Sequence, residues 1–287
     1  MTFNEFALAN EPAIRLAAFF GIFALMATWE AAAPRRARLH ARRVRWTANL
    51  GLVVLNSVLL RLVFPLAAVG FASFAAERGW GLLNNLALPE WAALILAVVA
   101  LDFAIYLQHV MFHAVPALWR LHRVHHADPD FDVTTGARFH PIEIILSMLI
   151  KFSVIAVLGA PAVAVLVFEV LLNATAMFNH ANLKLPAAVD AMLRRLLVTP
   201  DMHRVHHSTD VAEANSNFGF NLTWWDRLFG TYRSAALRPQ ESMEIGVGGL
   251  TGDPRCVSLP GLLALPFTSS GDDYAIGHGS EASHEVR

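Results

Sequence analysis

Residues 141–180 read PIEIILSMLIKFSVIAVLGAPAVAVLVFEVLLNATAMFNH. Two long apolar runs are separated only by Gly159, Ala160 and Pro161. A helix needs about 20 mostly apolar residues to cross the hydrocarbon core of a bilayer. Because proline cannot continue the hydrogen-bond ladder of a helix, this stretch predicts a tight hairpin of two membrane-spanning helices, over 141–159 and 162–179.

Three further apolar stretches precede the hairpin, at 13–31, 47–71 and 91–113. The 287-residue chain is 55% hydrophobic and 16% charged, with a mean hydropathy of +0.46. A soluble domain has about 25% charged residues, so this composition argues against a soluble or disordered protein. The single cysteine, Cys256, excludes an intrachain disulfide scaffold. We therefore predict an all-α polytopic membrane protein with four to five spanning helices.

The arginines predict how the chain is oriented in the membrane. The loop at 72–90 holds only Arg78, whereas six arginines crowd the first loop: Arg35, Arg36, Arg38, Arg42, Arg43 and Arg45. Lys and Arg are enriched in cytoplasmic loops, so we expect the first loop in the cytoplasm and the N-terminus outside. The preference for Arg over Lys favours a GC-rich bacterial source and hence a bacterial inner membrane. A net charge of -1 gives no basic field for nucleic acid.

Histidines gather on one side of this expected topology. Ten of the 13 histidines lie between His109 and His207, and the order of the spans places them all at or beyond cytoplasmic helix ends. The predicted fold is thus a membrane bundle with a cytoplasmic helical cap that carries a histidine-rich site.

The spacing of these histidines indicates metal binding. Four residues at helical spacing share one face of the third span: Asp102, Tyr106, His109 and His113. The pattern i, i+3, i+4 occurs twice, each time as His-Arg-Val-His-His: His122, His125, His126 and His203, His206, His207. Each such turn can aim three imidazoles at one point, and a catalytic zinc takes about three protein ligands. Two metal ions are therefore expected.

The ligand type does not select the element, because imidazole suits zinc, copper, iron and nickel. The sequence shows neither a Ser or Cys nucleophile with a partnering base nor a glycine-rich phosphate loop. A redox metal pair that faces the bilayer is the favoured interpretation.

Five segments of the chain resemble the fatty acid hydroxylase/sterol desaturase superfamily. They are 118–126 (LWRLHRVHH), 138–141 (RFHP), 179–180 (NH), 199–207 (TPDMHRVHH) and 225–231 (WDRLFGT), within a match over about 91–233. The resemblance implies an integral-membrane, non-haem diiron enzyme that hydroxylates or desaturates a lipid with O2 and two electrons. It also implies three histidine boxes: His109 and His113; His122, His125 and His126; His203, His206 and His207.

The same resemblance implies further roles. His180 matches another metal-binding histidine, while His140 lies in a family motif as either a ligand or a neighbour of one. The cofactor would be two iron ions, which zinc can replace in purified protein. Because the chain lacks the haem domain fused to some relatives, we expect a separate electron donor of the ferredoxin, rubredoxin or cytochrome b5 type with its reductase.

Neutral imidazoles leave the charge of a metal uncompensated, so nearby carboxylates are expected to orient and polarise them. Asp102, about two turns from His109, is the first candidate, with Tyr106 on the same face. Three further acidic candidates lie near the histidine boxes in the sequence: Asp128, Asp201 and Asp226.

We divide the chain into N-terminal membrane helices (1–90), a histidine-box catalytic domain (91–233) and a partly disordered C-terminal tail (234–287). The predicted substrate is a membrane lipid: a sterol-like molecule, a fatty acyl chain, a carotenoid or an ether lipid. Two alternatives remain, a divalent-metal transporter and a lipid-binding protein with a structural metal pair. Transport sites usually lie near the bilayer midplane, whereas these boxes gather at one face.

Two charged residues inside the hairpin are expected to pair. Lys151 and Glu169 lie at nearly equal distance from the turn at Gly159, and a lone charge in the membrane core costs about 2.5–3.5 kcal/mol on insertion scales. The sequence thus predicts a salt bridge or a shared polar pocket. Three remaining histidines are expected to be solvated: His40, His278 and His284.

Overall fold

A computed structural model describes residues 1–268, 275 and 276. Within these residues it is helical, with isolated β-bridges and no β-strand. The first half contains α1 (Phe3–Ala9), α2 (Glu11–Ala32), α3 (Arg42–Val63), α4 (Ala68–Glu77), η1 (Leu83–Asn85), α5 (Glu90–Ala114), α6 (Pro116–His126) and η2 (Thr135–Ala137). The second half contains α7 (Pro141–Leu158), α8 (Ala162–Asn179), α9 (Ala187–Leu193), α10 (Pro200–His206), α11 (Val211–Ala214), α12 (Trp224–Leu228), η3 (Pro254–Val257), α13 (Leu259–Ala264) and η4 (Leu265–Phe267).

Five stretches are long and apolar enough to cross a membrane, which agrees with the upper limit of the prediction. They are α2, α3 together with α4, α5, α7 and α8. The second of these is interrupted at residues 64–67, where Pro65 cannot continue the helix. The chain is therefore a multi-pass membrane protein by the length and composition of its helices.

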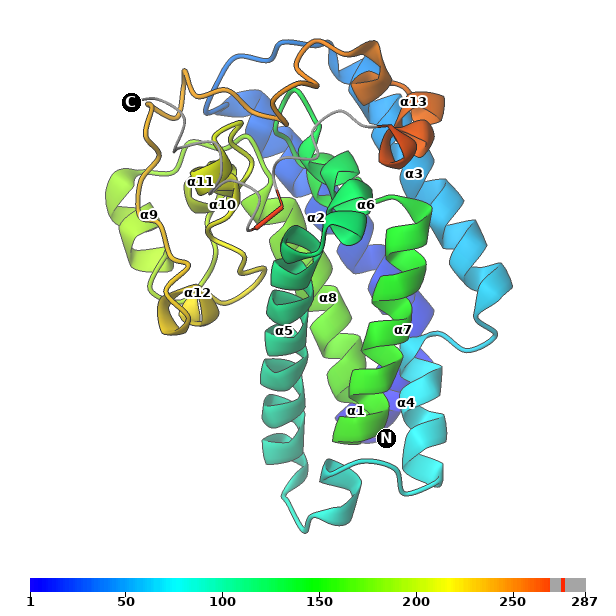
Figure 1. Ribbon diagram of the computed structural model, residues 1–287. Helices are drawn as coiled ribbons and strands as arrows, with labels where there is room; N and C mark the ends of the chain where they lie inside the picture. The colour runs from blue at the N-terminus through cyan, green and yellow to red at the C-terminus, as the bar shows by residue number, and fades with distance from the viewer. Residues whose placement is uncertain (269–274, 277–287) are drawn as a thin grey trace.

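These helices form a bundle with a helical cap at one end (Figure 1). The cap consists of residues 115–140 and 181–268 and contains α6 and α9–α13. The N-terminus and the α7–α8 turn lie at the opposite end of the bundle (Figure 1). Helix α8 is the most buried span and packs against α2, α4 and α5. The arginine-rich first loop reaches the cap end, as the expected topology requires.

The predicted helical hairpin is confirmed. Gly159 ends α7 in the left-handed conformation (φ 68°), and Pro161 precedes α8. A Cβ built on Gly81 would lie 2.0 Å from the backbone nitrogen of Gly159. The two glycines therefore allow the 79–85 loop to touch the hairpin turn, a contact that no larger residue permits.

The ion pair inside the hairpin is confirmed as well. Lys151 Nζ lies 2.5 Å from Glu169 Oε1. Arg15 of α2 contacts the other carboxylate oxygen of Glu169 and also bonds Glu11 at 2.7 Å. The three membrane helices α2, α7 and α8 thus share a charge cluster in which cations and anions neutralise one another.

The C-terminal third contributes to the folded core of the cap. Leu250, Cys256 and Leu262 are buried in one apolar cluster with Trp119 of α6 and Leu52 of α3. Leu250, Cys256 and Leu262 lie in 234–287, the segment that the sequence predicts to be a C-terminal tail. In the structure they pack between α6 and α3. His278 and His284 lie outside the described residues.

Candidate metal centre

Nine histidines converge where the bundle meets the cap, and all are buried. Their ring nitrogens form two groups, each within 4.8 Å. Group A consists of His109, His113, His122, His126 and His206; group B consists of His125, His180, His203 and His207. The nine histidines come from α5, α6 and α10 and from the ends of α8 and α10, so they meet only where these four helices are packed together.

Each His-Arg-Val-His-His box divides between the two groups, which differs from the expectation that one box aims at one point. On α6, His122 and His126 join group A while His125 joins group B. Consecutive helical residues point about 100° apart, so His125 and His126 diverge. The packing of α10 against α6 and α8 supplies the complementary histidines.

The nitrogen separations fit bound metal ions. Four pairs of Nε2 atoms face each other at 3.0–3.2 Å: His113 and His126, His109 and His206, His125 and His180, His180 and His203. Two nitrogens at about 2.1 Å from a common ion would lie roughly 3 Å apart. The buried Nε2 atoms of His122 and His207 have no hydrogen-bond partner. The donor set therefore fits one ion in each group.

The opposite ring nitrogens are held by the protein. Nδ1 of His109, His206 and His180 lies 2.7–2.8 Å from the carbonyl oxygens of Phe218, Ser216 and Ala176, respectively. A carbonyl accepts only from a protonated Nδ1, which leaves Nε2 with its lone pair free for a metal. The backbone thus sets both the tautomer and the direction of these imidazoles.

Burial keeps the histidines of the cap, and His180 at the end of α8, uncharged. It lowers the pKa of His122 and of His180 to about 3. Burial first and neighbouring histidines second lower the pKa of the remaining cap ligands well below the ordinary value: His125, His126, His203, His206 and His207. Neutral imidazole is the form that binds metals.

His140 lies outside both groups. It is the N-cap of α7, where its Nδ1 accepts from the backbone N–H of Ile142, and its Nε2 lies 3.3 Å from the carbonyl oxygen of Leu263. Its Nδ1 therefore caps the start of α7, and its Nε2 contact connects α7 to α13. Of the two roles that the sequence left open, this geometry supports the one without metal ligation.

The predicted orienting groups make their hydrogen bonds elsewhere. Asp102 accepts from Trp225 Nε1, and Tyr106 pairs with Thr231. Asp201 binds Arg35 and Arg204. An aspartate accepts hydrogen bonds from whichever donor the fold places beside it. Sequence spacing does not reveal that for Asp102 this donor is an indole, and for Asp201 a guanidinium, from a distant segment.

One carboxylate that sequence reasoning missed does contact a ligand. Glu143 Oε1 lies 2.6 Å from Nδ1 of His122. The available signal was an acidic residue in the first turn of a mostly apolar span, three residues after His140. Asp226 contacts no histidine directly. It accepts hydrogen bonds from the backbone N–H groups of Phe218 and Gly219, and the carbonyl oxygen of Phe218 in turn bonds Nδ1 of His109.

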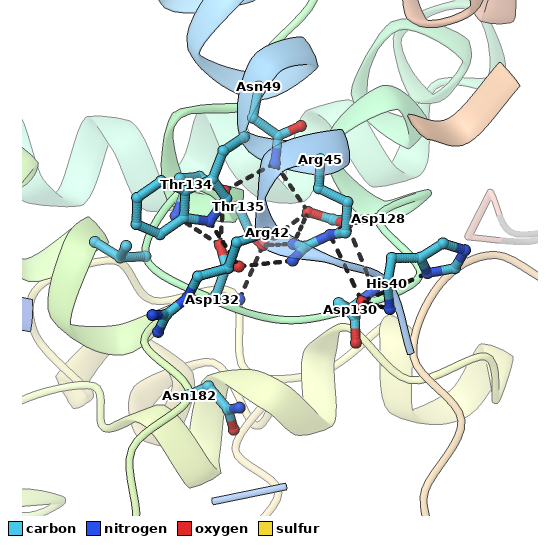
Figure 2. Close-up of polar contacts among 12 residues, drawn as sticks. His40, Arg42, Arg45, Asn49, Asp128, Asp130, Asp132, Thr134, Thr135 and Asn182 are labelled. Carbon is cyan, nitrogen blue, oxygen red and sulfur yellow. Dashed lines mark hydrogen bonds and ion pairs between the residues drawn. The ribbon is translucent and has the colours of Figure 1, made fainter. Parts of the chain in front are cut away.

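Asp128 belongs to a buried ionic network with Arg45 and Asp132 (Figure 2). Arg45 of α3 bonds both oxygens of Asp128 at 2.7 Å and one oxygen of Asp132 at 2.6 Å. Asn49 and Thr135 also donate to Asp128. Although burial alone would raise it, the charges of Arg45 and Arg138 hold the pKa of Asp128 well below its usual range.

This network changes the interpretation of the arginine-rich loop. Arg45 is buried, Arg42 lies 3.5 Å from Glu30, and Arg35 contacts Asp201 and Glu241. Arg35 and Arg45 thus fasten the first loop and the start of α3 to the cap, while Arg42 connects α3 to α2. Within the network, Asp130 accepts the backbone N–H groups of Leu39 and His40 (Figure 2).

A cavity of about 430 Å³ extends from the membrane bundle to group A. Side chains of α2, α3, α5, α7 and α8 line it, and most of its surface is apolar. His109 and His122 of group A form part of its wall, and the Arg15, Lys151 and Glu169 cluster lies on its lining as well. A membrane protein with five long apolar helices and two buried histidine groups that could hold metal ions, one of them on the wall of an apolar cavity, is the class that this geometry defines.

Comparison with known proteins agrees with this class. Residues 94–231 match the model of the family described as Fatty acid hydroxylase. The ornithine lipid hydroxylase OlsE of Rhizobium tropici is 31% identical over 66% of this chain and 54% of the relative. The human alkylglycerol monooxygenase is 28% identical over 48% of this chain and 30% of the relative. The mouse cholesterol 25-hydroxylase is 25% identical over 56% of this chain and 53% of the relative.

No solved structure matches the chain. The chain spans about half the length of the ornithine lipid hydroxylase, and less of the alkylglycerol monooxygenase. Residues 94–231 therefore resemble the fatty acid hydroxylase family, and the relatives named above belong to the fatty acid hydroxylase/sterol desaturase superfamily.

Proposed function

We propose that this protein is an O2-dependent lipid hydroxylase of the membrane, with two iron ions bound by groups A and B. The observation that carries the proposal is the position of group A, which forms one wall of an apolar cavity inside the membrane bundle. The three relatives named above have lipids in their names, namely ornithine lipid, alkylglycerol and cholesterol.

The iron pair would supply the oxidising power to break an unactivated C–H bond, which acid and base side chains lack. The protein's own contribution is to hold neutral imidazoles in fixed directions through Phe218, Ser216, Ala176 and Glu143. The apolar cavity would hold the alkyl part of the substrate and exclude water. Hydroxylation is favoured over desaturation because the named relatives are hydroxylases and monooxygenases.

We also propose that the cap faces the cytoplasm of a bacterium and receives two electrons from a separate donor, ferredoxin-like, rubredoxin-like or cytochrome b5-like. The six arginines of the first loop lie at the cap end and support this orientation. A cysteine in an accessible cap loop, labelled with an impermeant maleimide in spheroplasts and in inverted vesicles, tests it. Labelling only in inverted vesicles is expected, and labelling in spheroplasts would reverse the orientation.

The first experiment is the metal content per chain of detergent-purified protein expressed with iron supplied and zinc limited. We expect about two irons, and their loss in His125→Ala and His206→Ala. His140→Ala serves as the matched control and should retain both ions, because His140 lies outside the two groups. A zinc pair that iron cannot replace would favour a lipid-binding protein with structural metals, and metal flux in proteoliposomes would favour a transporter.

Metal content alone does not establish turnover. Lipid extracts of cells that express the wild-type chain should contain new hydroxylated lipids, absent with His206→Ala. Iron-loaded protein that yields no oxidised lipid with any of the three donor types would contradict the proposed activity while leaving the metal site intact.

A further inference from the structure

Three buried oxygen atoms on the wall of the cavity have no hydrogen-bond partner. They are Oδ1 of Asn56, Oε1 of Gln108 and Oε2 of Glu143. A buried polar group without a partner is unfavourable, and native proteins satisfy nearly all of them with protein or ligand atoms. Three such oxygens in one cavity therefore point to something that binds there.

Asn56 provides the firmest case because its amide orientation is determined. Its Nδ2 donates to the carbonyl oxygen of Phe139 at 2.9 Å. The reversed amide would place two oxygens against each other, so Oδ1 is left as the unpartnered atom. Asn56 is 7% exposed and comes from α3.

The other two oxygens lie beside the group A ligands. Gln108 precedes His109 in α5 and contacts Ser147 Oγ at 2.7 Å, while Glu143 contacts His122 through its other oxygen. Glu143 and Ser147 are four residues apart and share one face of α7. Two of the three unpartnered oxygens therefore belong to side chains at the metal end of the cavity.

Three charged side chains of the same cavity, Arg15, Lys151 and Glu169, are already paired with one another. Both Glu169 oxygens are taken by Lys151 and Arg15, and Arg15 is bound to Glu11 as well. The unpartnered acceptors near group A thus favour a hydrogen-bond donor on the ligand, and the paired charges do not call for an anionic one.

We propose that the cavity recognises a lipid carrying a hydroxyl or amide N–H close to the carbon that reaches group A, with Asn56 as the specificity-determining acceptor and Gln108 beside it. The inference rests on the proposed function in one respect: it treats the lipid that binds in the cavity as the substrate. It disfavours a plain hydrocarbon such as an unsubstituted carotenoid, since such a ligand leaves all three oxygens unpaired.

The test measures binding, so it does not depend on turnover. Full-length protein in detergent is titrated with tritiated 1-hexadecanol, which is then displaced by unlabelled competitors. Two matched pairs differ only in the donor: 1-hexadecanol against 1-methoxyhexadecane, and N-methylhexadecanamide against N,N-dimethylhexadecanamide. We expect the wild-type chain to prefer the donor-bearing member of at least one pair by roughly tenfold, and the pair concerned distinguishes hydroxyl from amide.

Asn56→Leu should reduce that preference to about twofold or less by weakening only the donor-bearing probe. The control is Asn173→Leu, which removes an amide from the same cavity; Asn173 already donates to the carbonyl of Glu169 in its own helix, so the preference should persist. Unchanged binding of the methyl ether shows that each variant is folded.

Two results would overturn the proposal. Equal binding of both members of each pair by the wild-type chain would mean that water satisfies these oxygens. A loss of affinity in Asn56→Leu that is equal for alcohol and ether would assign Asn56 a purely structural role. Neither result bears on the iron content, so failure of this inference is distinguishable from failure of the proposed oxidase function.

Discussion

Arg45 Nε and Nη2 each lie 2.7 Å from one of the two carboxylate oxygens of Asp128, and neither side chain is exposed to solvent. The pair connects α3 to the segment that directly follows His125 and His126. An ion pair buried to this degree does little for stability in comparison with apolar packing, but removing one partner leaves an uncompensated charge. Its effect is therefore to impose one position on the second histidine box.

Arg45→Met should destabilise the protein by about 3–5 kcal/mol, because Asp128 would stay buried without its bidentate partner. The thermal unfolding of detergent-purified protein measures this change. Arg43→Met is the matched control, since Arg43 is exposed, and its effect should stay within about 0.5 kcal/mol. Equal stability of the two variants would show that the Arg45 network does not hold the cap in place.

Glu143→Leu should weaken metal binding by about 10- to 100-fold, the usual cost of losing a partner that orients a metal ligand. Metal retention during dialysis against a graded chelator measures the change. Glu143→Gln should be milder, because its amide oxygen can still accept from His122. Asp201→Asn is the comparison, since Asp201 bonds arginines and no histidine. A larger metal loss with Asp201→Asn would reverse our assignment of the orienting carboxylate.

Gly136→Ala should disturb group B through sterics alone. A Cβ at Gly136 would lie 2.6 Å from the carbonyl oxygen of Ala176 and 3.1 Å from His180 Nδ1. Overpacking of this kind costs about 1–3 kcal/mol, and displacement of His180 should lower the iron content of the purified variant. In Gly21→Ala the added Cβ meets no atom within 4 Å, so normal iron content and stability are expected. Full iron occupancy in Gly136→Ala would contradict the close approach.

The stability of the metal-free protein should fall with pH in a defined window. The pKa of His122 and of His180 is about 3 in the folded chain, against about 6.5 when unfolded. Between these values the unfolded chain binds more protons, so the free energy of unfolding decreases as pH falls. We expect these two imidazoles to lower the unfolding temperature progressively as pH falls below about 6.5.

Differential scanning fluorimetry of chelator-treated protein between pH 7.5 and 5 measures this dependence. The paired carboxylate of Asp128 does not interfere, because a lowered acid pKa removes stability only below about pH 4. His122→Gln should reduce the slope by about one proton. An unfolding temperature that is constant across the whole range would mean that the pKa of these imidazoles is the same in the folded and the unfolded chain.

Much of the architecture follows from local properties of the sequence. Gly159 and Pro161 predict the hairpin because their effects are local. Glycine readily adopts the left-handed backbone conformation that ends a helix, and proline lacks the N–H that would continue one. The spacing of Lys151 and Glu169 about the turn predicts their contact, because equal helical rise places them at equal depth. Arg15 was not foreseen as a third member, since it comes from a separate helix whose rotation is set by packing.

The amino-acid sequence by itself determined the apolar spans and the helical spacing of the histidine boxes, since hydropathy and a 3.6-residue period are properties of single segments. The tertiary structure alone decided that His125 and His126 serve different groups, that Glu143 contacts His122, and that Arg45 is buried against Asp128. Each of these depends on the relative position of two helices distant in sequence. That position is set by the summed packing of the bundle, which no single segment encodes.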